Sequence, residues 1–127
     1  MIKGLAHIGV FVKDLEVSKK FYRDVLGFDL PCSMKNDLDG AKVCFARRGD
    51  IHIELVEFPE YTEKKDGFID HIAMEVDDID AAKKELEAKG IVFEMDEPVY
   101  LADVYDGCKY LLFRGPDGEH LEIDQMM

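Results

Sequence analysis

The sequence predicts an α+β fold made of two copies of one unit, each a strand, a helix and three further strands. Residues 4–15 and residues 68–79 align without a gap and share the pattern His-Ile-x-x-x-Val-x-Asp-(Leu/Ile), which indicates a tandem duplication. In each copy this segment begins with the apolar and polar alternation typical of a strand. It continues into a helical pattern that ends at a glycine, Gly27 or Gly90. Short strand patterns follow in both copies, so the copies share one order of elements.

Composition places the chain among ordinary globular proteins, because 47% of its 127 residues are hydrophobic and 35% are charged. We expect a single domain of two modules, 1–60 and 67–127, with a charged linker at about 59–67. The net charge of −12 disfavours nucleic acid and membranes as partners, and an anionic small-molecule substrate would need a local basic group. The sequence has neither a bilayer-spanning apolar run nor a signal-peptide core, which predicts a cytoplasmic protein.

Each expected element follows from a local pattern of residues. Alternating apolar residues indicate strands, aspartates are suited to cap the two helices, and turn-forming clusters separate the later strands. The first copy is expected to hold a strand at 7–12, a helix from Asp14 to Gly27, a weakly patterned strand and polar loop within 28–40, and strands at 41–46 and 51–58. The second is expected to hold a strand at 71–76, a helix from Asp78 or Asp80 to Gly90, and strands at 91–94, 109–114 and 119–124, with a less regular stretch at 98–106 as a further candidate strand.

Four candidate metal ligands lie on the strand faces that the alternation turns away from the helices. His7 and His71 occupy matching positions on the first strand of each copy, and Glu54 and Glu122 occupy matching positions on the last strand. Two imidazoles and two carboxylates suit a divalent transition metal that keeps open positions for water or substrate. Burying two carboxylates together without a cation would be costly. The sequence therefore predicts a metal site formed by these four side chains.

A few neighbouring residues are weaker candidates. His52 and His120 precede the glutamates by two residues, about 6.5 Å along a strand, which suits a supporting or cavity-lining role better than ligation. Lys109 is a candidate for substrate binding, with a solvated strand face as the alternative. A metal with open positions polarises a carbonyl, and a carboxylate that loosens from it can accept a proton. This chemistry favours proton-transfer isomerisation over hydrolysis.

The sequence resembles the vicinal oxygen chelate superfamily, which includes glyoxalase I, methylmalonyl-CoA epimerase, extradiol dioxygenases and the fosfomycin and bleomycin resistance proteins. The resemblance covers essentially the whole chain, and the residues that carry it are Asp14-Leu15, Ser18, Phe21-Tyr22, Leu26-Gly27-Phe28, Asp70-His71-Ile72-Ala73 and Pro116-Asp117-Gly118 with Glu122. It implies tandem βαβββ modules that form an incompletely closed mixed β-barrel around the metal, with the helices outside.

Within the superfamily, the full His, Glu, His, Glu set is similar to glyoxalase I, the lactoylglutathione lyase. This resemblance implies a lyase or isomerase of methylglyoxal detoxification. It would convert the hemithioacetal of a 2-oxoaldehyde and a thiol to a 2-hydroxyacyl thioester by proton transfer through a metal-bound enediolate. Glu122 would match the catalytic base and Glu54 the opposite carboxylate. One divalent ion per site is implied, nickel or cobalt in a short chain such as this one, with zinc as the alternative.

Two positions depart from the glyoxalase I pattern. Phe11 and Phe58 stand where an arginine and an asparagine usually hold glutathione, which leaves the thiol open and makes both rings candidate substrate contacts. They would also serve as walls in a metal-free protein that sequesters a small molecule, as the bleomycin resistance proteins do. A homodimer is expected, because half-barrels with exposed sheet edges favour a partner. The site can close within one chain or across the dimer.

A second enzyme reading is an acyl-CoA epimerase similar to methylmalonyl-CoA epimerase. The residues that carry this likeness are His7-Ile8-Gly9-Val10, Phe21-Tyr22-Arg23-Asp24 and His71-Ile72-Ala73-Met74-Glu75. In that family the first carboxylate ligand is often a glutamine, whereas this chain has Glu54. The additional catalytic glutamate of that family would fall near Leu38.

Overall fold

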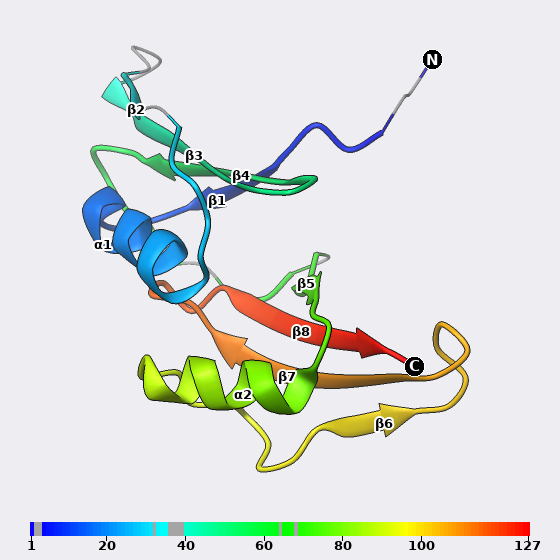
Figure 1. The fold of residues 1–127 in the computed structure, drawn as a ribbon. Helices are drawn as coiled ribbons and strands as arrows, with labels where there is room; N and C mark the ends of the chain where they lie inside the picture. The colour runs from blue at the N-terminus through cyan, green and yellow to red at the C-terminus, as the bar shows by residue number, and fades with distance from the viewer. Residues whose placement is uncertain (2–3, 32, 36–39, 64, 68) are drawn as a thin grey trace. The chain divides into compact units, whose positions relative to one another are not determined.

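The chain folds into two compact units, Met1–Glu63 and Lys64–Met127. Each unit holds one four-stranded mixed sheet, ordered β1-β4-β3-β2 in the first and β5-β8-β7-β6 in the second (Figure 1). The predicted α+β class and the repeated order of strand, helix and three strands are thereby confirmed. The computed structural model describes residues 1, 4–31, 33–35, 40–63, 65–67 and 69–127.

The first unit follows its sequence pattern closely. Its elements are β1 (Ile8–Phe11), α1 (Leu15–Lys20), the π-helical turn η1 (Phe21–Val25), β2 (Ser33–Lys35), β3 (Lys42–Arg48) and β4 (Ile51–Glu57). The Asp14 carboxylate caps α1 by accepting bonds from two backbone N–H groups, and Gly27 ends the helical segment with a φ of 75°. The part of the predicted polar loop at 36–39, which includes Leu38, lies outside the described residues.

The core of the first unit lies on the helix side of its sheet. Ile53 and Leu55 of β4 are fully buried, and α1 contacts both β3 and β4. Because side chains alternate along a strand, Glu54 projects from the opposite face. That opposite face carries a smaller apolar cluster, which includes Val43 and Val56.

The second unit repeats this plan. Its elements are β5 (Ile72–Glu75), α2 (Ile79–Ala88), β6 (Val99–Leu101), β7 (Cys108–Arg114) and β8 (His120–Met126). Asp78 caps α2 through bonds of 3.0 Å, and α2 contacts β8. A side-chain oxygen at the end of the neighbouring strand also accepts the first helical N–H in each unit, from Glu57 in β4 and Gln125 in β8. None of the helices in the described ranges is long and apolar enough to cross a membrane.

The prediction of a strand at 91–94 is wrong. The backbone N–H of Ile91 bonds to the Leu86 carbonyl at the helix end, and only Glu94 donates to β7, at the Leu112 carbonyl. The Leu112 N–H donates to the Met95 sulfur at 3.2 Å instead of to a strand carbonyl. A side-chain acceptor stands here where a ladder carbonyl would, and the edge strand that pairs with β7 is β6, further along the chain.

Candidate metal centre

The pairing of β1 with β4 brings His7 and Glu54 together. The parallel register sets Gly9 opposite Glu54, and His7 shares this face because it lies two residues earlier. Nε2 of His7 is 3.7 Å from Oε2 of Glu54, and the imidazole ring packs edge-to-face on Phe45. We refer to His7 and Glu54 as the first half-site.

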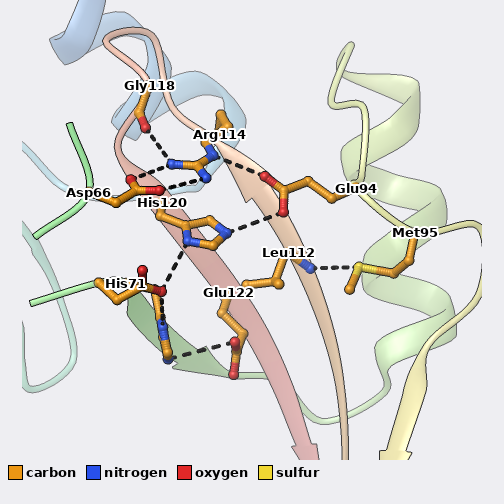
Figure 2. A network of polar contacts seen from close by, with 10 residues as sticks. Asp66, His71, Glu94, Met95, Leu112, Arg114, Gly118, His120 and Glu122 are labelled. Atoms are coloured by element: carbon orange, nitrogen blue, oxygen red, sulfur yellow. Dashed lines mark hydrogen bonds and ion pairs between the residues drawn. The ribbon is translucent and has the colours of Figure 1, made fainter. Parts of the chain in front are cut away.

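The second unit builds the same pair. Ala73 stands opposite Glu122 in the parallel register of β5 and β8, and His71 lies two residues earlier on the same face. Nε2 of His71 is 3.7 Å from Oε2 of Glu122 (Figure 2). We refer to His71 and Glu122 as the second half-site. The duplication has therefore reproduced both the donor types and their separation.

The environment of Glu122 favours a neighbouring cation. The side chain is 14% exposed, against 28% for Glu54. Burial, followed by the hydrogen bond and the charge of the adjacent Asp124 carboxyl, raises the pKa of Glu122 to about 7. Asp124 is itself buried, and within the described residues its Oδ1 accepts no hydrogen bond. An imidazole beside two crowded carboxyl groups is a donor set that fits a divalent ion.

The raised pKa of Glu122 predicts that the unfolding free energy of the metal-free protein decreases as the pH rises. The folded state holds this proton more tightly than the unfolded chain, whose carboxyl has the ordinary pKa of 4.5. The stabilisation is complete below pH 4.5 and is lost as the pH rises through about 7. Glu122→Gln avoids the loss, so we expect this variant to exceed the unmodified protein in unfolding free energy by about 1–2 kcal/mol at alkaline pH, after allowance for solvent screening.

Denaturant unfolding in the presence of a chelator, at acidic and alkaline pH, measures this difference. The two proteins should have nearly equal stability at acidic pH, where the carboxyl is protonated in both states. A difference that does not vary with pH would contradict the burial of Glu122.

A network of charged side chains surrounds His71 (Figure 2). Nδ1 of His71 lies 2.9 Å from Oδ2 of Asp70, and this hydrogen bond raises the pKa of His71 and lowers that of Asp70. The same oxygen lies 3.3 Å from Nδ1 of His120, whose Nε2 lies 3.3 Å from Glu94. Arg114 donates to Glu94 and, through two nitrogens, to the Asp66 carboxylate.

Asp70, His71 and His120 also form a group of metal-ligand types whose donor atoms lie within 4.8 Å of one another. Their closest approach is the 2.9 Å contact between Asp70 and His71, a distance typical of a hydrogen bond between a ring N–H and a carboxylate. The arrangement therefore satisfies these groups internally, while Nε2 of His71 faces Glu122.

The weaker candidates from the sequence differ in whether they lie on the sheet face that carries a half-site. Phe11 and Phe58 contact each other edge-to-face, with centroids 5.2 Å apart, and Phe11 lies on the face of the first half-site. His52 lies on the same face as Glu54, opposite Arg47. Lys109 is not brought to the second half-site, because the register puts Leu112, and not Lys109, on the face of Glu122.

Sequence reasoning missed the acidic and basic partners of the two histidines in the second unit. Asp70 offered one signal, since it directly precedes His71 whereas Ala6 precedes His7. Arg114 also offered one, since the predicted strands at 109–114 and 119–124 set it near His120 across a short turn. Glu94 offered none, because it stands far from both histidines in the sequence. His120, two residues before Glu122, lies beside the ring of His71, and its supporting role stays a prediction.

A family model described as the Glyoxalase/Bleomycin resistance protein/Dioxygenase superfamily matches residues 4–123. The chain belongs to this superfamily. The resemblance seen in the sequence motifs is therefore confirmed at the level of the superfamily. Membership also accounts for the duplicated strand, helix and three-strand unit.

Individual relatives in the glyoxalase, bleomycin resistance and dioxygenase superfamily point to no single activity. A protein called Uncharacterized protein YaeR, from Escherichia coli K12, is 35% identical, and the match covers 96% of this chain and 95% of that one. The mitochondrial methylmalonyl-CoA epimerase of Mus musculus is 35% identical over 73% of this chain and 57% of its own length. The fosfomycin resistance protein FosX of Listeria monocytogenes, solved with Mn(II) and sulfate, is 20% identical and has a TM-score of 0.74, covering 100% of this chain and 95% of FosX. Likeness at that identity shows a shared fold.

Proposed function

We propose that this chain is a metal-dependent enzyme that moves a proton at a carbon next to a carbonyl group. The observation that carries the proposal is the matched half-site: each unit sets Nε2 of a histidine 3.7 Å from a glutamate oxygen on the neighbouring parallel strand. In the proposed centre, His7, Glu54, His71 and Glu122 together hold one divalent ion, within one chain or across a homodimer. Such an ion, when bound, polarises the substrate carbonyl and makes the neighbouring C–H more acidic.

Glu122 is the proposed base that takes the proton. In the metal-free protein burial raises the pKa of Glu122 to about 7, and a bound cation would lower this pKa and favour the ionised carboxylate, which is the form that accepts a proton. Asp124 contributes to this pKa through its hydrogen bond and charge. The pairing of β5 with β8 fixes the position of the Glu122 backbone beside Ala73, whose small side chain leaves room on this face.

The proposed substrate class is an acyl thioester with a proton-bearing carbon next to the carbonyl, as in an acyl-CoA epimerase. Support comes from the similarity to methylmalonyl-CoA epimerase, which extends over 73% of this chain. Epimerisation breaks the C–H bond on one face of the carbon, leaves the electron pair in the enolate, and forms a new C–H bond on the other face. Two carboxylates suit this sequence, and we assign proton removal to Glu122 and proton return to Glu54. The edge-to-face pair of Phe11 and Phe58 offers an apolar contact surface in the unit of the first half-site.

A second candidate is the glyoxalase I type of lyase, acting on a hemithioacetal. The observation in its favour is that the first carboxylate position holds Glu54, and not the glutamine that is frequent in the epimerase family. Glu54 lies 3.7 Å from His7, the same distance that separates Glu122 from His71. In that reaction a proton leaves one carbon and returns to its neighbour, so one carboxylate is sufficient. The phenylalanine pair at positions 11 and 58 then favours a thiol other than glutathione.

The test has two stages. Metal-stripped protein is first titrated calorimetrically with Ni²⁺, Co²⁺, Mn²⁺ and Zn²⁺, and we expect one ion per site. The loaded protein is then incubated in D₂O with methylmalonyl-CoA, and separately with hemithioacetals of methylglyoxal and either glutathione or cysteine. Deuterium entering the carbon next to the thioester carbonyl supports the epimerase, and a 2-hydroxyacyl thioester product supports the lyase. Failure of every ion to bind would overturn both and leave a small-molecule-sequestering protein.

A further inference from the structure

The two half-sites differ in what supports their histidines. Asp70 precedes His71 and bonds to its ring, whereas Ala6 precedes His7 and offers no side-chain acceptor. We propose that Asp70 is a positioning residue that holds His71 in one tautomer and orientation, so that the second half-site is preorganised to receive a divalent ion. The inference rests on the metal site of the proposed function. It adds the residue that sets the geometry and the half-site that binds the ion more strongly.

The hydrogen-bonding chemistry determines which ring nitrogen is free. An ionised carboxylate only accepts hydrogen bonds, so the 2.9 Å contact with Asp70 requires the proton of a neutral ring to sit on Nδ1 of His71. The lone pair then lies on Nε2, which is 3.7 Å from Oε2 of Glu122. Metal-ligating histidines commonly donate their other ring N–H to a carboxylate, which orients the ring and increases its basicity. Asp70 is placed to do this for His71.

Asp70 alone would be a weak anchor, because its side chain is 55% exposed. His120, which is 10% exposed, supplies the second contact by placing Nδ1 3.3 Å from the same Asp70 oxygen. The ring of His120 is held in turn at Nε2 by Glu94. An aspartate that contacts two rings at once has fewer rotamers open to it than one on an open surface.

Arg114 anchors the far end of the network. It pairs with His120 across the β7 and β8 ladder, and its guanidinium bonds to Glu94 on one side and to Asp66 on the other (Figure 2). It also donates to the carbonyl of Gly118 in the turn between these strands. The position of Asp70 is therefore supported from β7, β8 and the segment after α2, in addition to the loop that carries it.

The first half-site has a different kind of support. His7 packs edge-to-face on Phe45, a contact that restrains the ring plane without selecting a tautomer. Among the residues that the structure describes, no hydrogen bond selects the tautomer of His7, so we expect its imidazole to adopt the correct tautomer and orientation only when an ion binds. We infer that the second half-site contributes more of the metal affinity for this reason.

The experiment compares Asp70→Ala and Asp70→Asn with a charge-matched control, Asp66→Asn. The control removes a carboxylate from the same network but one that bonds to Arg114 and to neither histidine. Nitrogen-15 NMR of metal-free protein reports the tautomer of each ring, with His71 assigned from the spectrum of His71→Gln. Calorimetry with Ni²⁺ and Zn²⁺ reports affinity, and amide spectra establish that each variant is folded.

We expect unmodified protein and Asp66→Asn to show the Nδ1–H tautomer of His71, and Asp70→Ala to show a mixture. Metal affinity should fall about 10- to 100-fold in Asp70→Ala, the usual effect of losing an outer partner of a metal ligand. Metal affinity should fall less in Asp70→Asn, because the amide oxygen of asparagine still accepts the hydrogen bond from His71. Equal affinity in unmodified protein and Asp70→Ala, or an equal loss in Asp66→Asn, would overturn the inference.

Failure of the proposed metal site gives a different result. Unmodified protein would then bind neither ion, although the tautomer of His71 would still respond to Asp70→Ala. Tight binding by unmodified protein together with an unaffected Asp70→Ala would instead leave the metal site standing and remove only the role of Asp70.

Discussion

Replacing Glu122 with glutamine is expected to lower turnover by about 10²- to 10⁴-fold at saturating metal, the range that general acid–base catalysis contributes. The amide keeps the size of the side chain and an oxygen for the ion, but it cannot accept a proton from carbon. Exchange of the substrate proton with D₂O, followed by mass spectrometry, measures this step directly. Metal content is determined on the same samples, so that loss of the ion is separated from loss of the base.

Glu54→Gln is the matched control for this experiment, because Glu54 occupies the corresponding place in the first half-site. For an epimerase we expect it to retain exchange at one face of the carbon while losing inversion. For a hemithioacetal lyase we expect much of the turnover to remain. Unchanged activity in Glu122→Gln would exclude Glu122 as the base.

Replacing His71 with alanine is expected to weaken metal binding by more than about 100-fold, since losing only an outer partner already costs 10- to 100-fold. His7→Ala should weaken metal binding less, because within the described part of the chain the ring of His7 has no carboxylate that supports it as Asp70 supports His71. His52→Ala is the control, a histidine two residues from Glu54 and outside the proposed ligand set. Calorimetric titration measures all three variants, and a large loss in His52→Ala would contradict the ligand assignment.

Mixing His7→Ala with His71→Ala tests how the half-sites combine. If one ion is held across a homodimer, a mixed dimer contains one centre with both histidines intact, and part of the activity returns. If the centre lies within one chain, every chain in the mixture lacks one of its two histidines, and mixing restores no activity. Activity of the mixture, compared with each variant alone, distinguishes the two arrangements.

The sequence predicted most of the secondary structure because its signals were local. The alternation along β4 and β8 follows from the two-residue period of a strand, which puts Glu54 and Glu122 opposite the buried aliphatic residues. Asp14 and Asp78 cap the helices with their own side chains, a contact between residues two and three apart. Because the chain is duplicated, each local pattern occurs in both copies, and the assignment in one copy supports the assignment in the other.

The strand expected at 91–94 shows where local pattern was insufficient. Its apolar residues fit a strand, but whether a ladder forms depends on what lies beside β7. There the sulfur of Met95 accepts the Leu112 N–H, a contact across 17 residues. Such competition between a side chain and a backbone acceptor depends on packing, which the sequence pattern does not contain.

The sequence by itself determined the repeat, the α+β class, the superfamily resemblance and the faces on which His7, Glu54, His71 and Glu122 lie. Only the tertiary structure decided that the two half-sites are supported differently. The bond from His120 to Asp70 joins residues 50 apart, and the bond from Arg114 to Asp66 joins residues 48 apart. Contacts over such separations depend on how strands pair and how side chains are buried, so periodicity in the sequence predicts the face of a residue but not its partner.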